Sequence, residues 1–367
     1  MPRDGGLTGR QGTVVTGIMR NAQANPHTGN LRTGGIAHAG RDGLCRRTGI
    51  GVGHLEISTP QRRLPGPTAL GRPVQVAVHC LQMGLALAFQ GAVEQRGESA
   101  RSTMPSQQTF IVTGAASGIG HATAVRLIER GHRVLSLDLK RPTADVAGHT
   151  SCDLADPASI DVALSGIKEP ISALLNIAGV PGTVGAEKTM RVNLLGLRHL
   201  TEALWNRITD NGRIVNVASI AGNNWRKRRG PLTELLSTPD FSAGLAWWQA
   251  NGSGVGTDPY TFSKEAVVLY TMQLAGRGLA RGIRVNDVGP GPIDTPIFPD
   301  FEQMTGRDMM QSYISMVGRL GKPDDIAEAI IVLAEGGIGW LNGQHIVVDG
   351  GLTAGFSAGW KAGRSLA

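Results

Sequence analysis

Short apolar runs that alternate with helical segments most constrain the fold of this chain. From residue 108 onward, strand-like runs include TFIVTG, RVLSLD, ISALLNIAG, GRIVNVAS, IRVNDVGPG and HIVVDGG, and segments such as GIGHATAVRLIERG and PDDIAEAIIVLAE have helical character. Strands that are apolar throughout and alternate with helices indicate a parallel sheet covered on both faces. We therefore expect an α/β fold with a doubly wound parallel sheet in a single domain.

The first 103 residues differ from the rest in composition. They hold 12 Arg, no Lys and 18 Gly, and they carry the whole formal net charge of +7. Such a segment has too little apolar surface to offset the entropy lost on ordering. We expect residues 1–103 to be a disordered or non-native extension, with Met104 as the natural start. An Arg-rich organelle transit peptide is the alternative. The segment contains only three serines, and this low number argues against a transit peptide.

The cysteines and the apolar stretches exclude several classes of protein. Cys45, Cys80 and Cys152 are far apart and form no CxxC pair, so neither a disulfide framework nor a metal site is predicted. The most apolar run, residues 74–93, is interrupted by polar residues and glycines and makes a poor membrane span. No signal-peptide order is present, so we expect a cytoplasmic protein.

A glycine-rich stretch, TGAASGIG at residues 113–120, stands between the first predicted strand and the first predicted helix. Gly114 permits a tight turn, and Gly118 and Gly120 permit close approach of the backbone to a ligand. The N-terminus of the following helix offers free N–H groups to a pyrophosphate. This context predicts a dinucleotide-binding loop rather than an ordinary turn.

Asp138 ends the second predicted strand, 18 residues after Gly120. A carboxylate at this place accepts hydrogen bonds from the ribose hydroxyls and repels a 2′-phosphate. We therefore expect NAD rather than NADP as the cofactor, although the nearby Lys140 and Arg141 weaken that expectation.

One of three tyrosines, Tyr260, lies four residues before Lys264 in a segment that predicts the start of a helix. Residues at i and i+4 share a helix face, so the ammonium can lie near the phenol. A neighbouring cation favours the phenolate and lowers the pKa of a tyrosine from its usual value of about 10. Tyr260 is therefore a candidate general base for alcohol oxidation. An exposed helix face is the alternative.

Two further polar residues strengthen this hypothesis. Ser219 ends the predicted strand RIVNVAS, and ligands bind at the carboxyl ends of strands in doubly wound sheets. Asn193 lies inside a long predicted helix, where asparagine is a mediocre helix former. A contact with Lys264, direct or through water, would explain Asn193; a surface position is the alternative.

Together these motifs resemble the classical short-chain dehydrogenases/reductases. TGAASGIG, NIAG, Asn193, Ser219, YTFSK and PGPIDTP occur in the family's order, over residues 108 to about 352. The resemblance implies a Rossmann-type fold and a catalytic tetrad of Asn193, Ser219, Tyr260 and Lys264. It implies cofactor contacts by Gly114, Ser117, Gly118, Ile119, Gly120, Asp138, Asp153, Leu154, Asn176, Ala178, Gly179, Tyr260, Lys264, Ile293 and Thr295. The sequence departs from the family at Ile177, where a second Asn is usual.

The connection between Ser219 and Tyr260 is 40 residues long, which is unusual for the family. We expect this insertion, residues 222–257, to lie beside the active site and to form a helix pair. Its three tryptophans predict either a wall for an aromatic or polycyclic substrate or packing onto the domain or a partner subunit: Trp225, Trp247 and Trp248. The basic run at 226–229 is expected to be a solvated loop.

The insertion, NIAGVPGT and WLNGQHIVVDGGL resemble the branch that holds coniferyl-alcohol dehydrogenase and 3α-hydroxysteroid dehydrogenase/carbonyl reductase. We therefore expect an NAD-dependent oxidoreductase domain over residues 104–356 and a tail at 357–367. It would interconvert a secondary or aryl-allylic alcohol and its carbonyl, as a homodimer or homotetramer without membrane or nucleic-acid partners. A non-catalytic dinucleotide sensor and nucleic-acid binding through the Arg-rich N-terminus are the alternatives.

Overall fold

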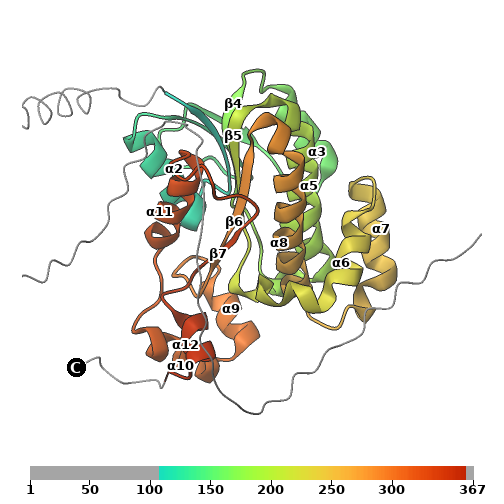
Figure 1. Ribbon diagram of the computed structural model, residues 1–367, viewed down its shortest axis with the longest axis vertical. Helices are drawn as coiled ribbons and strands as arrows, with labels where there is room; N and C mark the ends of the chain where they lie inside the picture. Colours follow the sequence, from blue (N-terminus) through green and yellow to red (C-terminus); the bar gives the residue numbers. More distant parts are fainter. Residues whose placement is uncertain (1–106, 361–367) are drawn as a thin grey trace, which may run out of the picture. The chain divides into compact units, whose positions relative to one another are not determined.

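The computed structural model describes residues 107–360, which form a seven-stranded parallel sheet with the strand order β3-β2-β1-β4-β5-β6-β7 (Figure 1). The order reverses between β1 and β4, so the doubly wound sheet is confirmed. The predictions for residues 1–103, for Cys45 and Cys80, and for the chain after residue 360 lie outside the described residues.

Six of the seven strands coincide with apolar runs of the sequence. The strands are β1 (Thr109–Thr113), β2 (Arg133–Asp138), β3 (Gly148–Ser151), β4 (Ile171–Asn176), β5 (Ile208–Val217), β6 (Arg284–Pro290) and β7 (His345–Val348). The exception is β3, whose sequence GHTS has no apolar pattern and which pairs with β2 at the sheet edge. Sequence analysis does not predict it.

Helices cover both faces of the sheet, as expected (Figure 1). On one face α2 (Gly118–Glu129) packs against α11 (Pro323–Ala334), and the other face carries α3 (Pro157–Ser165), α5 (Leu197–Leu204) and α8 (Pro259–Arg277). Because side chains alternate across a strand, β1 contributes to both cores. Phe110 and Val112 belong to the first and Ile111 to the second.

The long helix predicted around Asn193 contains an irregular turn. It begins with α4 (Ala186–Met190), passes through a π-helical turn, η2 (Arg191–Gly196), and continues as α5 and the short η3 (Trp205–Arg207). A side chain at Gly196 would collide with the carbonyl oxygen of Leu154, so the turn lies directly against the segment that follows β3. Single π turns of this kind occur frequently at functional sites.

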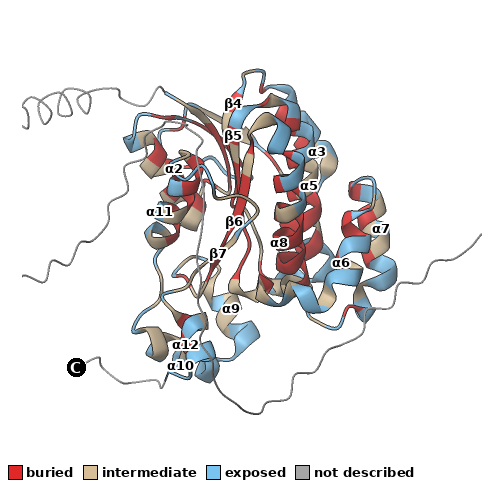
Figure 2. Ribbon diagram, viewed as in Figure 1, coloured by how far each residue is buried: buried red, intermediate tan, exposed pale blue. Residues whose placement is uncertain are grey.

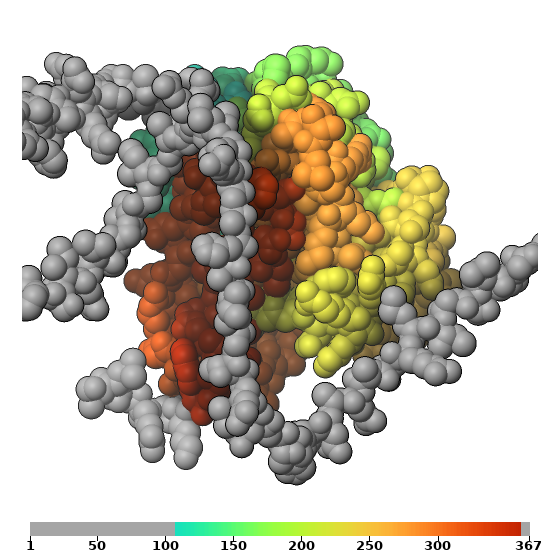
Figure 3. Space-filling view, in the orientation of Figure 1, coloured from blue at the N-terminus to red at the C-terminus, as the bar shows by residue number. Residues whose placement is uncertain are grey.

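The insertion forms η4 (Ile220–Arg228), α6 (Arg229–Leu236), α7 (Phe241–Asn251) and η5 (Gly252–Gly254). Its η4 and α6 pack against α8, which is consequently buried along much of its length (Figure 2). In the space-filling view the yellow insertion lies beside the orange α8 (Figure 3).

Three helices that the sequence does not predict gather at the carboxyl end of the sheet: α9 (Phe298–Thr305), α10 (Arg307–Val317) and α12 (Leu352–Ala358) (Figure 1). Two short 3₁₀ helices, η1 (Gly182–Val184) and η6 (Leu279–Arg281), complete the described residues. Within residues 107–360 we find no helix whose length and apolar character would let it cross a bilayer.

Candidate active site

A pocket of about 1030 Å³ opens at the carboxyl ends of the strands, where the strand order reverses. Doubly wound sheets bind ligands at this place. The pocket brings together most of the residues that the sequence predicts for the cofactor and the reaction: Gly114, Ser117, Gly118, Ile119, Gly120, Asp138, Asp153, Leu154, Ala178, Gly179, Ser219, Tyr260, Lys264, Ile293 and Thr295.

The glycine loop has the conformation and close contacts that its sequence predicts. Gly114 has φ +74°, and a Cβ on it would lie 2.9 Å from the Cα of Ala178. A Cβ on Gly120 would collide with the carbonyl oxygen of Gly114. The loop therefore admits no side chain at these positions, and α2 begins within the stretch, at Gly118, with its first N–H groups free of intrahelical partners. This cradle fits a dinucleotide pyrophosphate.

Asp138 holds the glycine loop as well as closing β2. Its Oδ2 accepts a hydrogen bond from Ala116 N at 2.9 Å, and its Oδ1 accepts one from Lys140 N at 3.0 Å. Each carboxylate oxygen keeps a further lone pair with which it can accept from a ribose hydroxyl. The side chains of Lys140 and Arg141 belong to exposed residues at this end of the pocket.

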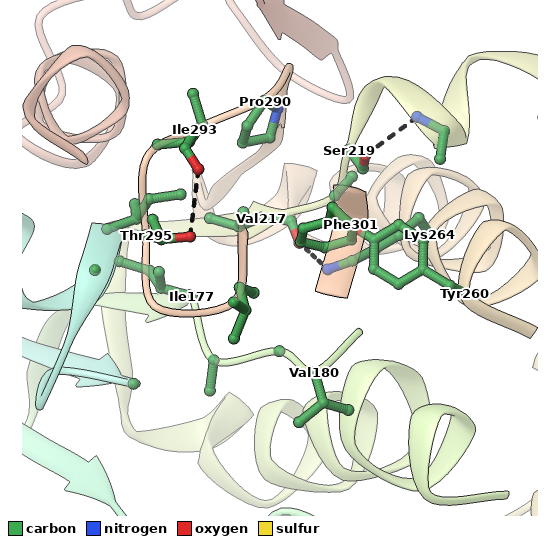
Figure 4. Close-up of a pocket in the computed structure, with 18 of the residues that line it drawn as sticks. Ile177, Val180, Val217, Ser219, Tyr260, Lys264, Pro290, Ile293, Thr295 and Phe301 are labelled. Carbon is green, nitrogen blue, oxygen red and sulfur yellow. Dashed lines mark hydrogen bonds between the residues drawn. The ribbon is translucent and has the colours of Figure 1, made fainter. Parts of the chain in front are cut away.

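Tyr260 and Lys264 lie one turn apart at the start of α8. The Asp258 side chain caps this helix by accepting from Thr261 N at 2.9 Å. The Lys264 Nζ lies 5.8 Å from the centroid of the Tyr260 ring and donates to the carbonyl oxygen of Val217 at 2.9 Å (Figure 4). The helix therefore presents both side chains to the pocket on one face, as the i, i+4 spacing predicts.

The electrostatics of the pair differ from the expectation. Burial raises the pKa of Tyr260 to about 12, with the Ser219 hydrogen bond lowering it and Asp258 raising it further. Burial also lowers the pKa of Lys264 to about 8, while Asp287 favours its charged form. The prediction of a lowered pKa for Tyr260 is therefore wrong for the protein chain by itself, because desolvation of the phenol is the largest cause of the shift.

Ser219 lies two residues after the end of β5 and caps η4, since its Oγ accepts from Ala221 N at 3.2 Å. Asn193 lies in the π turn and is 1 % exposed, so the alternative of a surface asparagine is wrong. Its Oδ1 accepts from Val180 N at 2.8 Å and its Nδ2 donates to Val180 O at 2.9 Å. A Cβ on Gly179 would lie 3.3 Å from Asn193 Oδ1 and 3.4 Å from Lys264 Nζ, so both polar atoms face this glycine.

Asn176 is the predicted cofactor residue that the structure leaves outside the pocket. Its Nδ2 donates to Thr201 Oγ1 at 3.0 Å and to Asn216 Oδ1 at 2.8 Å, and the residue is 2 % exposed. The side chain therefore joins a polar network in the core between β4, β5 and α5.

The side of the pocket next to Tyr260 is apolar and aromatic. Phe301 of α9 packs edge-on against Tyr260, with 5.1 Å between ring centroids. The other apolar side chains come from the three helices at the carboxyl end: Met304, Met310, Tyr313 and Phe356. This wall is not predicted from the sequence; the signal for it is the aromatic and methionine-containing segment IFPDFEQM, directly after PGPIDTP.

The tryptophans of the insertion lie elsewhere. Trp247 and Trp248 stack on Phe262 of α8, with centroid distances of 6.2 and 5.7 Å, and Trp225 packs against the same core. Over the described residues the pocket lining includes none of them, so the predicted aromatic wall is wrong and the packing alternative holds. The insertion reaches the pocket through Asn223 and Asn224 instead.

An ion pair fixes the insertion to α8. Arg228 Nε donates to Glu265 Oε2 at 2.6 Å, and its Nη2 contacts the other carboxylate oxygen. The Glu265 side chain is fully buried. The basic run is thus only partly a solvated loop, because its third residue anchors the end of η4.

Comparisons with known proteins agree with this geometry. A family model described as short chain dehydrogenase matches residues 108–230, and one described as enoyl-(acyl carrier protein) reductase matches residues 244–353. The chain is 37% identical over 250 residues to coniferyl-alcohol dehydrogenase of Pseudomonas sp., covering 68% of this chain and 98% of the relative. It is 32% identical over 280 residues to cis-4-hydroxycyclohexanecarboxylate dehydrogenase of Sinomonas cyclohexanicum, again covering 68% and 98%.

Among solved structures, the chain is similar to the 3-alpha-hydroxysteroid dehydrogenase from Pseudomonas sp. B-0831 complexed with NADH. The TM-score is 0.58 at 26% identity, over 68% of this chain and 98% of that one. The chain therefore belongs to the short-chain dehydrogenase/reductase family and is an oxidoreductase that acts on CH–OH groups with a nicotinamide dinucleotide.

Proposed function

We propose that the protein is an NAD-dependent dehydrogenase of a secondary or aryl-allylic alcohol, with Tyr260 as its acid/base. The observation that carries the proposal is the meeting of Ser219, Tyr260 and Lys264 at one wall of the pocket, across from Ile293 and Thr295 (Figure 4). This arrangement leaves room for an alcohol between the hydroxyl groups and the nicotinamide end of the dinucleotide.

In this proposal Ser219 Oγ orients the alcohol oxygen and Tyr260 Oη takes its proton. NAD, when bound, supplies the hydride acceptor and a positive charge beside the site. Lys264 remains largely charged at neutral pH, because its pKa is about 8. Tyr260, whose own pKa stands at about 12, then loses its proton more readily because two positive charges favour the phenolate.

The proposed part of Asn193 is to hold the wall behind Lys264. Its amide pairs with both backbone groups of Val180, which fixes the strand end next to Gly179. Because Asn193 Oδ1 and Lys264 Nζ face the same glycine, a water between them could carry protons away from Lys264. This relay remains a prediction.

The proposed preference for NAD rests on Asp138. Its carboxylate is held by Ala116 N and Lys140 N at the end of β2, where a 2′-phosphate would meet a negative charge. In Asp138→Ser we expect the ratio of kcat/KM for NADP over that for NAD to rise at least tenfold. A wild-type enzyme that uses NADP as well as NAD would contradict this assignment.

The proposed substrate carries an aromatic or other bulky apolar group. The wall of Phe301, Met304 and Phe356 supports this class, and so does the name of the relative, coniferyl-alcohol dehydrogenase. The direction of the reaction, a cytoplasmic location, the homo-oligomer and the domain limits 104–356 remain predictions.

The deciding experiment measures alcohol-dependent NADH formation in the wild type and in Tyr260→Phe. Removal of a general base should lower kcat by about 10²–10⁴. Tyr270→Phe is the matched control, because the Tyr270 hydroxyl donates to Glu202 at 2.9 Å on the outer helices. Equal rates in wild type and Tyr260→Phe would refute the mechanism, whereas NADH binding without turnover in the wild type would favour the sensor.

A further inference from the structure

A polar network that the sequence analysis does not use lies beside the pocket. Asp287 of β6 is fully buried, and the strand register places His345 of β7 opposite it. His345 Nδ1 contacts Asp287 Oδ1, and His345 Nε2 lies 2.8 Å from Asn223 Oδ1 in η4. Asn223 in turn lines the pocket. The side chains of Asp287, His345 and Asn223 therefore form a continuous chain of contacts from the interior of the sheet to the wall of the pocket.

The imidazole ring of His345 packs closely against Gly289. A Cβ on Gly289 would lie 2.5 Å from Cε1 of His345 and 3.3 Å from the backbone carbon of Ser219. Any larger residue at Gly289 would displace the ring or the backbone at Ser219. The ring is therefore confined close to the backbone of Ser219.

Both ring nitrogens of His345 face oxygen atoms. A neutral imidazole has one N–H, so the ring can pair with two acceptors only as a cation. Burial raises the pKa of Asp287, whereas the hydrogen bond and charge of His345 lower it, so a charged ring would stabilise the carboxylate where water cannot reach it. Lys264 on α8 adds a second positive charge that acts on the same carboxylate. Asn223 is the partner from η4, and it carries no charge.

The charge on His345 decides what Asn223 offers to the pocket. When Nε2–H donates to Asn223 Oδ1, the amide nitrogen of Asn223 remains free to donate. A neutral ring would accept at Nε2, and the amide would turn to present its oxygen instead. A 3₁₀ helix rises about 2 Å per residue, which places Asn223 about 8 Å along η4 from Ser219. In an aryl-allylic alcohol such as coniferyl alcohol, the oxygen substituents on the ring lie at a similar distance from the reacting carbon.

We propose that the ion pair of His345 with Asp287 makes Asn223 a hydrogen-bond donor that selects alcohols carrying an acceptor oxygen away from the reacting carbon. His345 and Asp287 are positioning residues, and Asn223 is the residue that touches substrate. The kinetic part of this inference rests on the proposed function, whereas the charge state of His345 does not.

The charge state is tested by ¹⁵N NMR of the histidine side chains in the full chain. His345 is identified among the nine histidines as the signal lost in His345→Gln. We expect both of its ring nitrogens to be protonated at pH 7 in the wild type. A ring with one unprotonated nitrogen at pH 7 would overturn the proposal, whether or not the protein turns over any alcohol.

The selectivity is tested with coniferyl alcohol and with cinnamyl alcohol, which lacks the ring oxygens. In Asn223→Ala the ratio of kcat/KM for coniferyl over cinnamyl alcohol should fall up to about tenfold, the equivalent of one hydrogen bond. His345→Leu should do the same.

The matched control is His199→Leu, which removes a second histidine–carboxylate pair on the surface, where His199 Nε2 lies 2.8 Å from Asp161 Oδ1. It should leave the ratio unchanged. An equal loss with both alcohols in Asn223→Ala, or no loss with either, would show that Asn223 does not select substrates. If the wild type oxidises neither alcohol, the proposed function fails while the NMR result still decides the state of the network.

Discussion

Removing the Arg228 guanidinium should destabilise the fold far more than removing an ordinary surface arginine. Arg228 pairs through two nitrogens with Glu265, whose side chain is fully buried in α8, and its own side chain is 18% exposed. In Arg228→Ala the carboxylate would stay buried without its counter-charge. Breaking a buried pair by removing one partner costs about 3–5 kcal/mol.

That cost is a large part of the free energy of unfolding, which is about 5–15 kcal/mol for a domain. At about 2–4 °C per kcal/mol for a domain of this size, Arg228→Ala should lower Tm by about 10 °C. The double variant Arg228→Met/Glu265→Leu removes both charges and fills the space with apolar groups. It should recover most of the loss, because the remaining desolvation cost also disappears.

The assay is urea unfolding of wild type, Arg228→Ala, Arg228→Met, Glu265→Leu and the double variant; the last three form a double-mutant cycle with the wild type. Arg130→Ala serves as a control, since Arg130 forms an exposed pair with Glu335 at 2.8 Å and should cost under about 1 kcal/mol. The reasoning is refuted if Arg228→Ala costs no more than this control, or if the double variant is as unstable as the single one.

Two further predictions concern Lys264 and the insertion. Folding lowers the pKa of Lys264 from 10.5 to about 8, so between these pH values the unfolded chain binds more protons than the folded one. The free energy of unfolding of the wild type should therefore rise by about 3 kcal/mol relative to that of Lys264→Met as pH rises through that window. Denaturant titrations at pH 7 to 11 measure it, and a parallel course of the two proteins would contradict it. Trp248→Ala should lower the free energy of unfolding by about 3–5 kcal/mol, because it leaves a cavity against Phe262. The KM for the alcohol should change less than twofold, and a large rise in KM would mean that the tryptophans do line the substrate site.

Most strands and the glycine loop could be predicted because their signals are local. A buried parallel strand is apolar along most of its length, as in ISALLN and RIVNV, and a glycine at position 120 is required by its immediate neighbours. The edge strand β3 could not be predicted, since its pairing with β2 depends on backbone hydrogen bonds rather than on GHTS side chains. The helices α9, α10 and α12 could not be predicted from the sequence either.

The site could be predicted in part. Tyr260 and Lys264 share one helix, so their spacing alone places them together. The sequence leaves open whether the insertion's tryptophans contact the substrate or pack onto the domain, because it gives their proximity to the site but not the direction of each ring, and Trp247 turns toward Phe262. Asp287 and His345 lie on different strands, 58 positions apart, and no local pattern joins them. Tyr260 shows a third limit, because its pKa depends on burial that only the packed fold reveals.

The π turn at Arg191–Gly196 has a consequence for any attempt to re-engineer this helix. One extra residue per turn offsets the sides of the helix before and after it by about 100°. Because of that offset, Asn193 contacts Val180 while Leu200 and Leu204, farther along the same helix, are buried against the sheet. Deleting one residue there to regularise the rod would bring the two sides into phase, so either the asparagine or the leucines would lose their contacts.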